Sequence, residues 1–270
     1  MIDPVLADMS AFDEVAADYD AREADNPIMQ LMRTRSLAML DSAFPQGSTL
    51  LDVGCGTGTE AMWLAKRGRT VFAVDSSPQM LKVLSQRAAA GGLLVSSKLL
   101  RAGDLASLLD VRGYASFDGA YSSFGALNTE PELGPTVAAL SRLVRPGGRI
   151  VLSVMNRWCA AEIALLAASG RASEAFRRTR QSILVGVGSA FTGVTYPSWP
   201  QLRRALDPEF RVLTVQALPL LLVPGAWPAL APHGRTYRVL CRLDAILAPR
   251  RPFSWLGDHL FVVAERRALR

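Results

Sequence analysis

Short apolar runs alternate with amphipathic segments over the first 155 residues of the chain. A short apolar run bounded by turn residues predicts a buried strand, and apolar residues at helical spacing predict a helix. The predicted strands are 50–53, 70–75, 98–101, 117–122 and 149–155, and the predicted helices between them are 60–65, 78–90 and 135–144. Strands that alternate with helices in this way are typical of an α/β fold with a doubly wound, mostly parallel sheet, which we predict here.

The segments on either side of this pattern differ from it. Residues 10–43 predict two helices, the second beginning at Pro27. The stretch 156–191 combines an Ala- and Arg-rich helical segment, with a basic cluster at 177–180, and a flexible glycine segment at 186–188. The remaining predicted elements are helices at 198–206 and 235–247, strands at 210–217 and 259–265, and an irregular Pro-rich segment at 218–232.

This order of elements predicts how the domain is divided. We expect a single domain spanning 1–270, with an N-terminal helical cap at 1–45. The stretch 156–197 is expected to be a lid insertion between the fifth and sixth strands. In a doubly wound sheet, ligands bind beyond the carboxyl ends of the strands, so the cap and the insertion are expected to close over that edge.

One stretch has the pattern of a ligand site. Residues 50–53 form an apolar run, and Gly54, Gly56 and Gly58 follow at alternate positions before a helix begins. A strand, a glycine turn and a helix N-terminus together present backbone N–H groups to a ligand. Asp75 ends the next strand about 20 residues on, where dinucleotide-binding sites place the acid that holds a ribose. The pattern therefore predicts a cofactor that contains a ribose.

The glycine spacing distinguishes between two kinds of cofactor. A nicotinamide dinucleotide site has the spacing G-x-G-x-x-G, whereas this chain has G-x-G-x-G over 54–58 and a Thr at position 59. This difference argues against an NAD(P)-dependent oxidoreductase, which remains the alternative function. A non-catalytic binding subunit that keeps the same fold is a further alternative.

Composition narrows the class of protein further. The net charge is +6, but the arginines are scattered rather than gathered in a stripe with aromatic residues, so a nucleic-acid partner is disfavoured. Three distant cysteines, Cys55, Cys159 and Cys241, match no metal spacing, and we expect no metal. The apolar segment 212–230 is interrupted by prolines, which argues against a membrane span. We expect a cytoplasmic protein.

The motifs resemble those of the class I S-adenosylmethionine (SAM)-dependent methyltransferases that act on small molecules. The similar segments are 51–58 for the first motif, 75–80 for the second, 103–105 for the third, 145–148 before the fifth strand, and 12–20 in the N-terminal helix. The resemblance covers about residues 10–155. It implies a seven-stranded Rossmann-like sheet with an antiparallel last strand, SAM as the cofactor and S-adenosylhomocysteine (SAH) as the product.

The resemblance also implies roles for single residues. The backbone of Gly54, Cys55 and Gly56 passes under the methionine part of SAM, and Asp52 sets the conformation of that loop. Asp75 accepts hydrogen bonds from both ribose hydroxyls. These residues are the implied centre of the cofactor site.

The implied surroundings of the adenine come from the second and third motifs. Ser76 and Met80 border the ring. Asp104 accepts a hydrogen bond from the adenine amino group, and the N–H of Leu105 lies nearby. Ser122, at the end of the fourth strand, faces the end of the cofactor that carries the methyl group.

The N-terminal helices supply the remaining implied contacts. Tyr19 closes over the cofactor, and Arg33 or Arg35 pairs with its carboxylate. Methyl transfer from a sulfonium proceeds largely by positioning and desolvation, so a general base is optional. The catalytic residue is unknown from the sequence, and the candidates are His233 and Tyr196.

The acceptor is constrained mainly by what the chain lacks. Methyltransferases that modify the amino groups of nucleic-acid bases have an Asp/Asn-Pro-Pro-aromatic motif after the fourth strand, where this chain has Ser-Ser-Phe-Gly at 122–125. Apolar residues dominate 183–191 and 218–230, near the expected lid. We therefore predict methyl transfer to an O, N or C nucleophile of a small, fairly hydrophobic molecule. The oligomeric state is not readable from the sequence.

Overall fold

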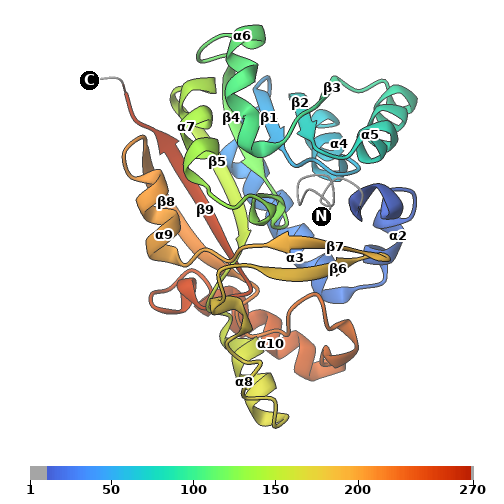
Figure 1. The fold of residues 1–270 in the computed structure, drawn as a ribbon, viewed down its shortest axis with the longest axis vertical. Helices are drawn as coiled ribbons and strands as arrows, with labels where there is room; N and C mark the ends of the chain where they lie inside the picture. The colour runs from blue at the N-terminus through green and yellow to red at the C-terminus, as the bar shows by residue number, and fades with distance from the viewer. Residues whose placement is uncertain (1–10, 269–270) are drawn as a thin grey trace, which may run out of the picture.

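A seven-stranded sheet with helices on both faces forms the centre of the computed structural model, which describes residues 11–268 (Figure 1). Its strands are β1 (Thr49–Val53), β2 (Thr70–Asp75), β3 (Val95–Leu99), β4 (Phe117–Ser122), β5 (Val144–Met155), β8 (Phe210–Leu218) and β9 (His259–Arg266). They are arranged in the order β3-β2-β1-β4-β5-β9-β8. Strands β1 to β5 pair in parallel, and β9 is antiparallel to both of its neighbours. The predicted fold class is confirmed.

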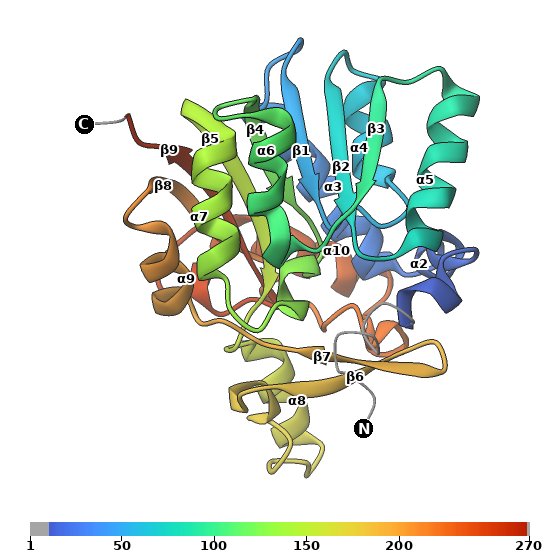
Figure 2. The ribbon, with the colours of Figure 1, turned by 45° about the horizontal axis from the view of Figure 1, so that its top comes forward.

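Helices cover both faces of this sheet (Figure 2). On one face lie α3 (Pro27–Ala43), α4 (Thr59–Ala65), α5 (Pro78–Gly91) and α10 (Gly234–Leu247). On the other lie α6 (Leu109–Arg112), α7 (Gly134–Leu143) and α9 (Trp199–Leu206). Successive strand residues point to opposite faces, so Leu50 packs with the α3 side and Leu51 with the α7 side. Burial on both faces explains the uninterrupted apolar run at 71–74 in β2.

The insertion between β5 and α9 forms a helix and a separate hairpin. The helix is α8 (Ala160–Ala168), and the hairpin pairs β6 (Ile183–Val187) with β7 (Ala190–Val194). Figure 2 shows this hairpin crossing below the sheet. The expected flexible segment at 186–188 is therefore wrong, because Gly186 pairs with Phe191 across the hairpin. Gly188 has a φ of +61° in the two-residue turn, where glycine is favoured.

A buried ion network fastens the insertion to the sheet. Arg178, in the predicted basic cluster, is 5% exposed and donates to the carboxylates of Glu162 and Asp258 at 2.5 and 2.6 Å. Burial alone would raise the pKa of Asp258, but the charge of Arg178 holds it below its usual range. The cluster was expected on a lid helix, but it forms a short 3₁₀ turn at Arg177–Thr179. Its central arginine is an internal anchor rather than a surface group.

Two strand boundaries also differ from the predicted ones. The third strand begins at Val95, three residues earlier than predicted from the 98–101 run, because it is a polar edge strand with little apolar pattern. The fifth begins at Val144 rather than 149 and includes the Pro-Gly-Gly segment. Its pairing with β4 shifts register between Phe117 and Gly119, so the Pro-Gly-Gly segment lies in a β-bulge within the strand. Within residues 11–268, we find no helix with the length and apolar character needed to cross a membrane.

Candidate functional site

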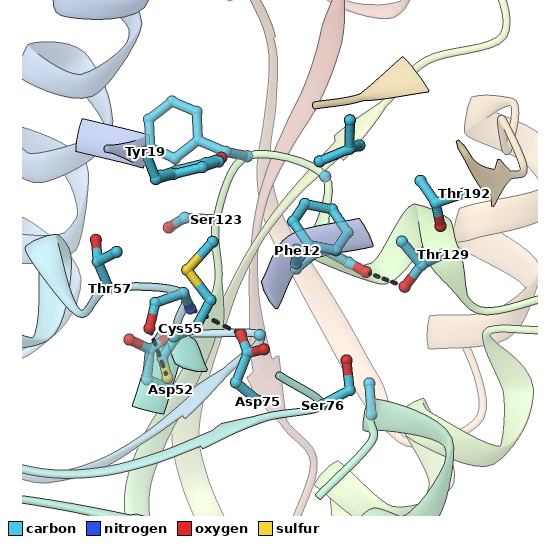
Figure 3. Close-up of a pocket in the computed structure, with 18 of the residues that line it drawn as sticks. Phe12, Tyr19, Asp52, Cys55, Thr57, Asp75, Ser76, Ser123, Thr129 and Thr192 are labelled. Atoms are coloured by element: carbon cyan, nitrogen blue, oxygen red, sulfur yellow. Dashed lines mark hydrogen bonds between the residues drawn. The ribbon is translucent and has the colours of Figure 1, made fainter. Parts of the chain in front are cut away.

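A cavity lies beyond the carboxyl ends of β1, β2, β4 and β5 (Figure 3). The glycine turn after β1, the end of β2 and the loop after β4 form one part of its wall. The opposite wall comes from the N-terminal helical residues and from the β6–β7 hairpin. Figure 3 shows Asp52 and Cys55 on one side, Thr129 and Thr192 on the other, and Asp75 between them.

The glycine turn is shaped by its own hydrogen bonds and by a close neighbour. The N–H groups of Gly54 and Cys55 both donate to the carbonyl of Val74, at 2.8 and 3.1 Å. Gly54 has a φ of +73°, and a Cβ at this position would lie 2.3 Å from the Cβ of Ala126. The short helix after β4, Ala126–Thr129, therefore packs directly on the turn, and only glycine leaves room for it.

Asp75 links the second strand to the glycine turn. Its Oδ2 accepts from the N–H of Gly56 at 2.8 Å, and its Oδ1 accepts from the N–H of Ser77 at 2.9 Å. Burial raises the pKa of this carboxyl, although the two backbone donors act in the opposite direction. Each carboxylate oxygen can accept more than one hydrogen bond. Asp75 therefore keeps acceptor capacity for a pair of hydroxyl groups inside the cavity.

Two further carboxylates are buried at the same wall. Asp52, on β1, and Glu60, at the start of α4, line the cavity and are only 2% and 7% exposed. Burial raises the pKa of both groups, and the charge of Glu60 raises that of Asp52 further. Because ionised carboxylates in a low-dielectric site repel one another, this wall favours a ligand with positive charge.

Arg33 is the cation that lines this part of the cavity. It contacts the carboxylate of Glu23 and lies 3.2 Å from an oxygen of Glu60. Its guanidinium also stacks over the ring of Phe124, 5.0 Å from the centroid. Burial would lower the pKa of Arg33, but the charges of Glu60 and Glu23 raise it overall. Tyr19 lies beside this group, and burial, followed by the charge of Glu23, raises the pKa of its hydroxyl.

Most of the residues predicted at a cofactor site line this cavity. They are Tyr19, Arg33, Asp52, Gly54, Cys55, Gly56, Asp75, Ser76 and Met80. Their convergence follows from the topology, since β1 and β2 are adjacent parallel strands whose carboxyl ends meet at one edge. The structure thus places these residues together at one edge of the sheet.

Two predicted residues lie outside the cavity because of local geometry. Arg35 pairs with Asp244 on α10, and its Nη2 donates to the carbonyl of Cys241 at 2.9 Å. It is two residues from Arg33, so it projects from a different face of α3. Ser122 is buried, whereas the next residue, Ser123, lines the cavity, because neighbouring strand residues point in opposite directions.

The third motif is also displaced from the cavity. Asp104 is exposed and Leu105 is fully buried in the core on the α7 side, so neither lines the cavity. The 3₁₀ turn over Ala102–Leu108 sets this orientation. The corresponding wall is formed instead by Ala102 and by Glu130, whose side chain is 8% exposed and lies 3.6 Å from Arg101.

Neither predicted catalytic candidate reaches the cavity. His233 is exposed at the N-cap of α10. Tyr196 is buried against Arg178, whose guanidinium lies 5.1 Å from the ring centroid, and the tyrosine helps to fix the insertion. The catalytic roles of both residues stay predictions, and both side chains lie outside the lining of this cavity. Among the described residues that line the cavity, none is a histidine or a lysine.

The sequence predicted an insertion over this edge of the sheet, but not that part of it forms a β-hairpin. Val185, Val187 and Val194 project from it into the cavity. At its tip, the hydroxyl of Ser189 donates to the carboxylate of Glu14 at 2.5 Å, which closes the hairpin against the N-terminal helix. The alternating apolar positions of 183–187 carried a strand signal, but the glycines at 186 and 188 obscured it.

Comparisons with known proteins agree with this architecture. Residues 51–152 match the family described as "Methyltransferase domain". A ubiquinone biosynthesis O-methyltransferase of Xanthomonas axonopodis pv. citri (strain 306) is 31% identical over 143 residues, which are 53% of this chain and 58% of that protein. The corresponding enzyme of Paracidovorax citrulli (strain AAC00-1) is 33% identical over 158 residues, 58% of this chain and 63% of that protein. The match thus spans about three fifths of these relatives' length.

Solved structures share the fold at lower identity. The 1,6-didemethyltoxoflavin-N1-methyltransferase of Burkholderia thailandensis, with bound 1,6-didemethyltoxoflavin and SAH, is 19% identical with a TM-score of 0.57, covering 98% of this chain and 88% of that one. The geranyl diphosphate C-methyltransferase of Streptomyces coelicolor A3(2) is 16% identical with a TM-score of 0.57, covering 87% and 77%. These similarities support the fold assignment.

The contact at Gly54 predicts a specific loss of stability. Gly47 has a similar φ, +80°, but a Cβ there meets nothing within 4 Å, so Gly47→Ala is a matched control. Both alanine variants carry the cost of a left-handed backbone, about 1–2 kcal/mol. Gly54→Ala also crowds Ala126, which adds about 1–3 kcal/mol. Urea unfolding is expected to rank Gly54→Ala below Gly47→Ala, and equal losses would contradict the close packing.

The buried carboxylate of Asp52 predicts that its replacement by an amide stabilises the folded chain, by an amount that depends on pH. Because its folded pKa is raised, the carboxyl destabilises the folded chain as pH rises from its unfolded pKa through its folded one. Asp52→Asn is therefore expected to increase the free energy of unfolding at pH values above the ordinary aspartate pKa of 3.8, and to change it less in acid. Urea titrations between acid and neutral pH measure this difference.

Asp118 provides a control, because its pKa is shifted in the opposite direction to that of Asp52. Hydrogen bonds from the N–H of Thr49 and from Arg145 lower its pKa, so its contribution is present above its unfolded pKa and is lost in acid. Asp118→Asn is expected to lose stability at neutral pH. If both variants change stability in the same direction at neutral pH, the assignment of Asp52 as a destabilising charge fails.

Proposed function

We propose that this chain, whose residues 51–152 match a methyltransferase domain family, is a class I SAM-dependent methyltransferase that binds SAM in this cavity and transfers the sulfonium methyl to a small molecule. The nucleophile is an O, N or C atom of an apolar acceptor, and SAH is the product. The observation that carries this proposal is the joining of the glycine turn and Asp75 at one cavity edge, through the 2.8 Å bond from Gly56 N–H to the carboxylate.

The residues present fit this cofactor. Asp75 has acceptor capacity for the two ribose hydroxyls, and the turn at 54–56 lets the main chain approach the methionine part closely. The buried carboxylates of Asp52 and Glu60 favour the positive charges that SAM carries. Arg33 is placed to receive the cofactor carboxylate, in exchange for part of its contact with Glu23.

The chain's own contribution to the reaction is positioning and exclusion of water. When bound, SAM supplies an electrophilic methyl group on a sulfonium. The hairpin and the N-terminal helix hold the acceptor in line and shield the site from solvent. A general base is optional for an acceptor that already has an available lone pair, and the described lining offers carboxylates rather than histidine or lysine for that role.

The cavity lining also supports a class of acceptor. The wall opposite the glycine turn is apolar, with Phe12, Met155, Val185, Val187 and Val194. The other charged lining groups are mostly acids, and Arg33 is already paired with two of them. Binding is therefore most favourable for an apolar acceptor that is neutral or cationic. An anionic acceptor would be repelled by the acidic lining groups.

The proposed division of the chain follows from the same walls. The stretch 156–197 and the helices before 45 act as a lid and cap, since both contribute lining residues. Of the alternatives, an NAD(P)-dependent oxidoreductase is disfavoured by the 54–58 glycine spacing and by Glu60 and Asp52, which would repel a pyrophosphate. A non-catalytic binding subunit would bind SAM and transfer no methyl group.

Cofactor affinity tests the proposed ribose contact. Asp75→Ala is expected to weaken SAH binding by about 2–3 kcal/mol, roughly 30- to 150-fold, as measured by isothermal titration calorimetry. Asp104→Ala is the matched control, because Asp104 is exposed outside the cavity, and it should stay within about threefold of wild type. Unchanged affinity in Asp75→Ala would remove this residue from the site, and a large loss in Asp104→Ala would restore the third motif to it.

Transfer itself is tested with isotopically labelled SAM and a cell extract. We expect mass spectrometry to detect labelled methyl groups in small, apolar, neutral or cationic molecules with the wild type, and a large reduction with Asp75→Ala. Binding of SAH without any labelled product would favour the non-catalytic subunit. A thermal shift with NAD and none with SAH would favour the oxidoreductase.

A further inference from the structure

Helix α10 divides its exposed surface into two parallel rows. One row consists of arginines at positions 235, 238 and 242. The other consists of Val239, Leu243 and Ile246, which are 52%, 43% and 49% exposed. Spacings of three and four residues place each row along one side of the helix. An apolar row of this length on an outer helix needs an explanation, because scattered single residues are the normal case.

The opposite face of α10 is fully engaged, so the apolar row does not belong to the core. Asp244 is completely buried, pairs with Arg35, and accepts from the N–H groups of Leu220 and Leu221 at 2.7 Å each. The hydroxyl of Tyr237 donates to the carbonyl of Pro27 at 3.1 Å. These contacts to α3 and to the loop after β8 fix the rotation of the helix. The two rows are therefore held outward.

The charge around this helix is of one sign. Between residues 210 and 264 the acids are Asp244 and Asp258, and both are buried, whereas the same segment contains six arginines. Within residues 11–268, no ion pair joins Arg235, Arg238 or Arg242 to an acid. The exposed part of this segment thus presents positive charge that it does not neutralise itself.

The segment before the helix also exposes an apolar side chain. Residues 226–230 include a short 3₁₀ turn, Pro228–Leu230, and Leu230 is 55% exposed. Arg177 from the insertion lies over the ring of Trp227, 5.3 Å from the centroid. This segment therefore also combines an exposed apolar side chain with an arginine. Figure 1 shows α10 in the lower half of the view, away from α5 to α7.

We propose that this face, α10 with residues 226–230, docks on an anionic lipid bilayer. An interfacial helix buries an apolar row at the boundary of the acyl chains and places Lys or Arg side chains at the level of the headgroups. Both rows of α10 match that arrangement at once. A second copy of the chain fits less well, because a symmetric contact would place the arginine rows close to each other. The inference does not depend on the proposed methyl transfer, although a bilayer also concentrates apolar acceptors.

The docking is tested by vesicle co-sedimentation of the full chain. We expect binding to phosphatidylcholine vesicles that contain about a third phosphatidylglycerol, weakening with salt, and little binding to pure phosphatidylcholine. Arg238→Gln/Arg242→Gln is expected to weaken partitioning about thirtyfold, since each arginine near the surface contributes about fivefold. Arg203→Gln/Arg204→Gln removes the same charge from exposed positions on α9 and should leave partitioning nearly unchanged.

The apolar row is tested separately. Leu243→Ser/Ile246→Ser should reduce vesicle binding, whereas Leu94→Ser/Val111→Ser, at positions 70% and 67% exposed elsewhere, should not. All variants should keep wild-type SAH affinity, which separates this test from that of the cofactor site. Equal losses in both arginine pairs, no binding to the anionic vesicles, or a dimer in light scattering that Leu243→Ser/Ile246→Ser abolishes would overturn the proposal.

Discussion

Burial of like charges is the constraint on which the site depends. Asp52, Glu60 and Asp75 are withdrawn from solvent at the ends of two adjacent strands and the start of a helix, and burial raises the pKa of each. A buried carboxylate destabilises the fold unless a cation or hydrogen-bond donors interact with it. Arg33 interacts with Glu60, and backbone N–H groups donate to Asp75, but these contacts compensate only part of the buried negative charge. A cavity built in this way is stabilised by a cationic ligand, which is the physical basis for proposing SAM.

The two halves of the cavity have different origins. The cofactor half is made by the sheet itself, where the contact of Gly54 with Ala126 ties the first and fourth strand ends together. The acceptor half is made by segments distant in sequence, which are held by specific contacts. The hydroxyl of Thr195 donates to the carbonyl of Glu130 at 3.0 Å, and Ser189 bonds to Glu14. Arg178 anchors the base of the insertion to Asp258. The proposed function therefore predicts that changes in the hairpin wall alter acceptor specificity without altering cofactor binding.

The net charge of the chain conceals an uneven distribution. The total is +6, yet the cavity is lined by acids such as Asp20 and Glu130, while the segment that contains α10 exposes arginines and no acid. Charge acts over about a Debye length, so each surface selects its partner by its local sign. Composition alone reports only the sum of these opposite regions.

Local signals in the sequence were sufficient to determine the central sheet and half of the site. The strands at 70–75 and 117–122 were predicted to the residue, because their buried positions are mostly apolar and turn residues bound each of them. The glycine turn and Asp75 were likewise readable, since strand order brings their positions together. Tertiary structure decided which face each side chain takes: Arg33 enters the cavity while Arg35 pairs with Asp244, and Ser123 does so rather than Ser122. It also placed Tyr196 against Arg178 and folded 183–194 into a wall, because these outcomes rest on contacts between segments far apart in the chain, which no local pattern encodes.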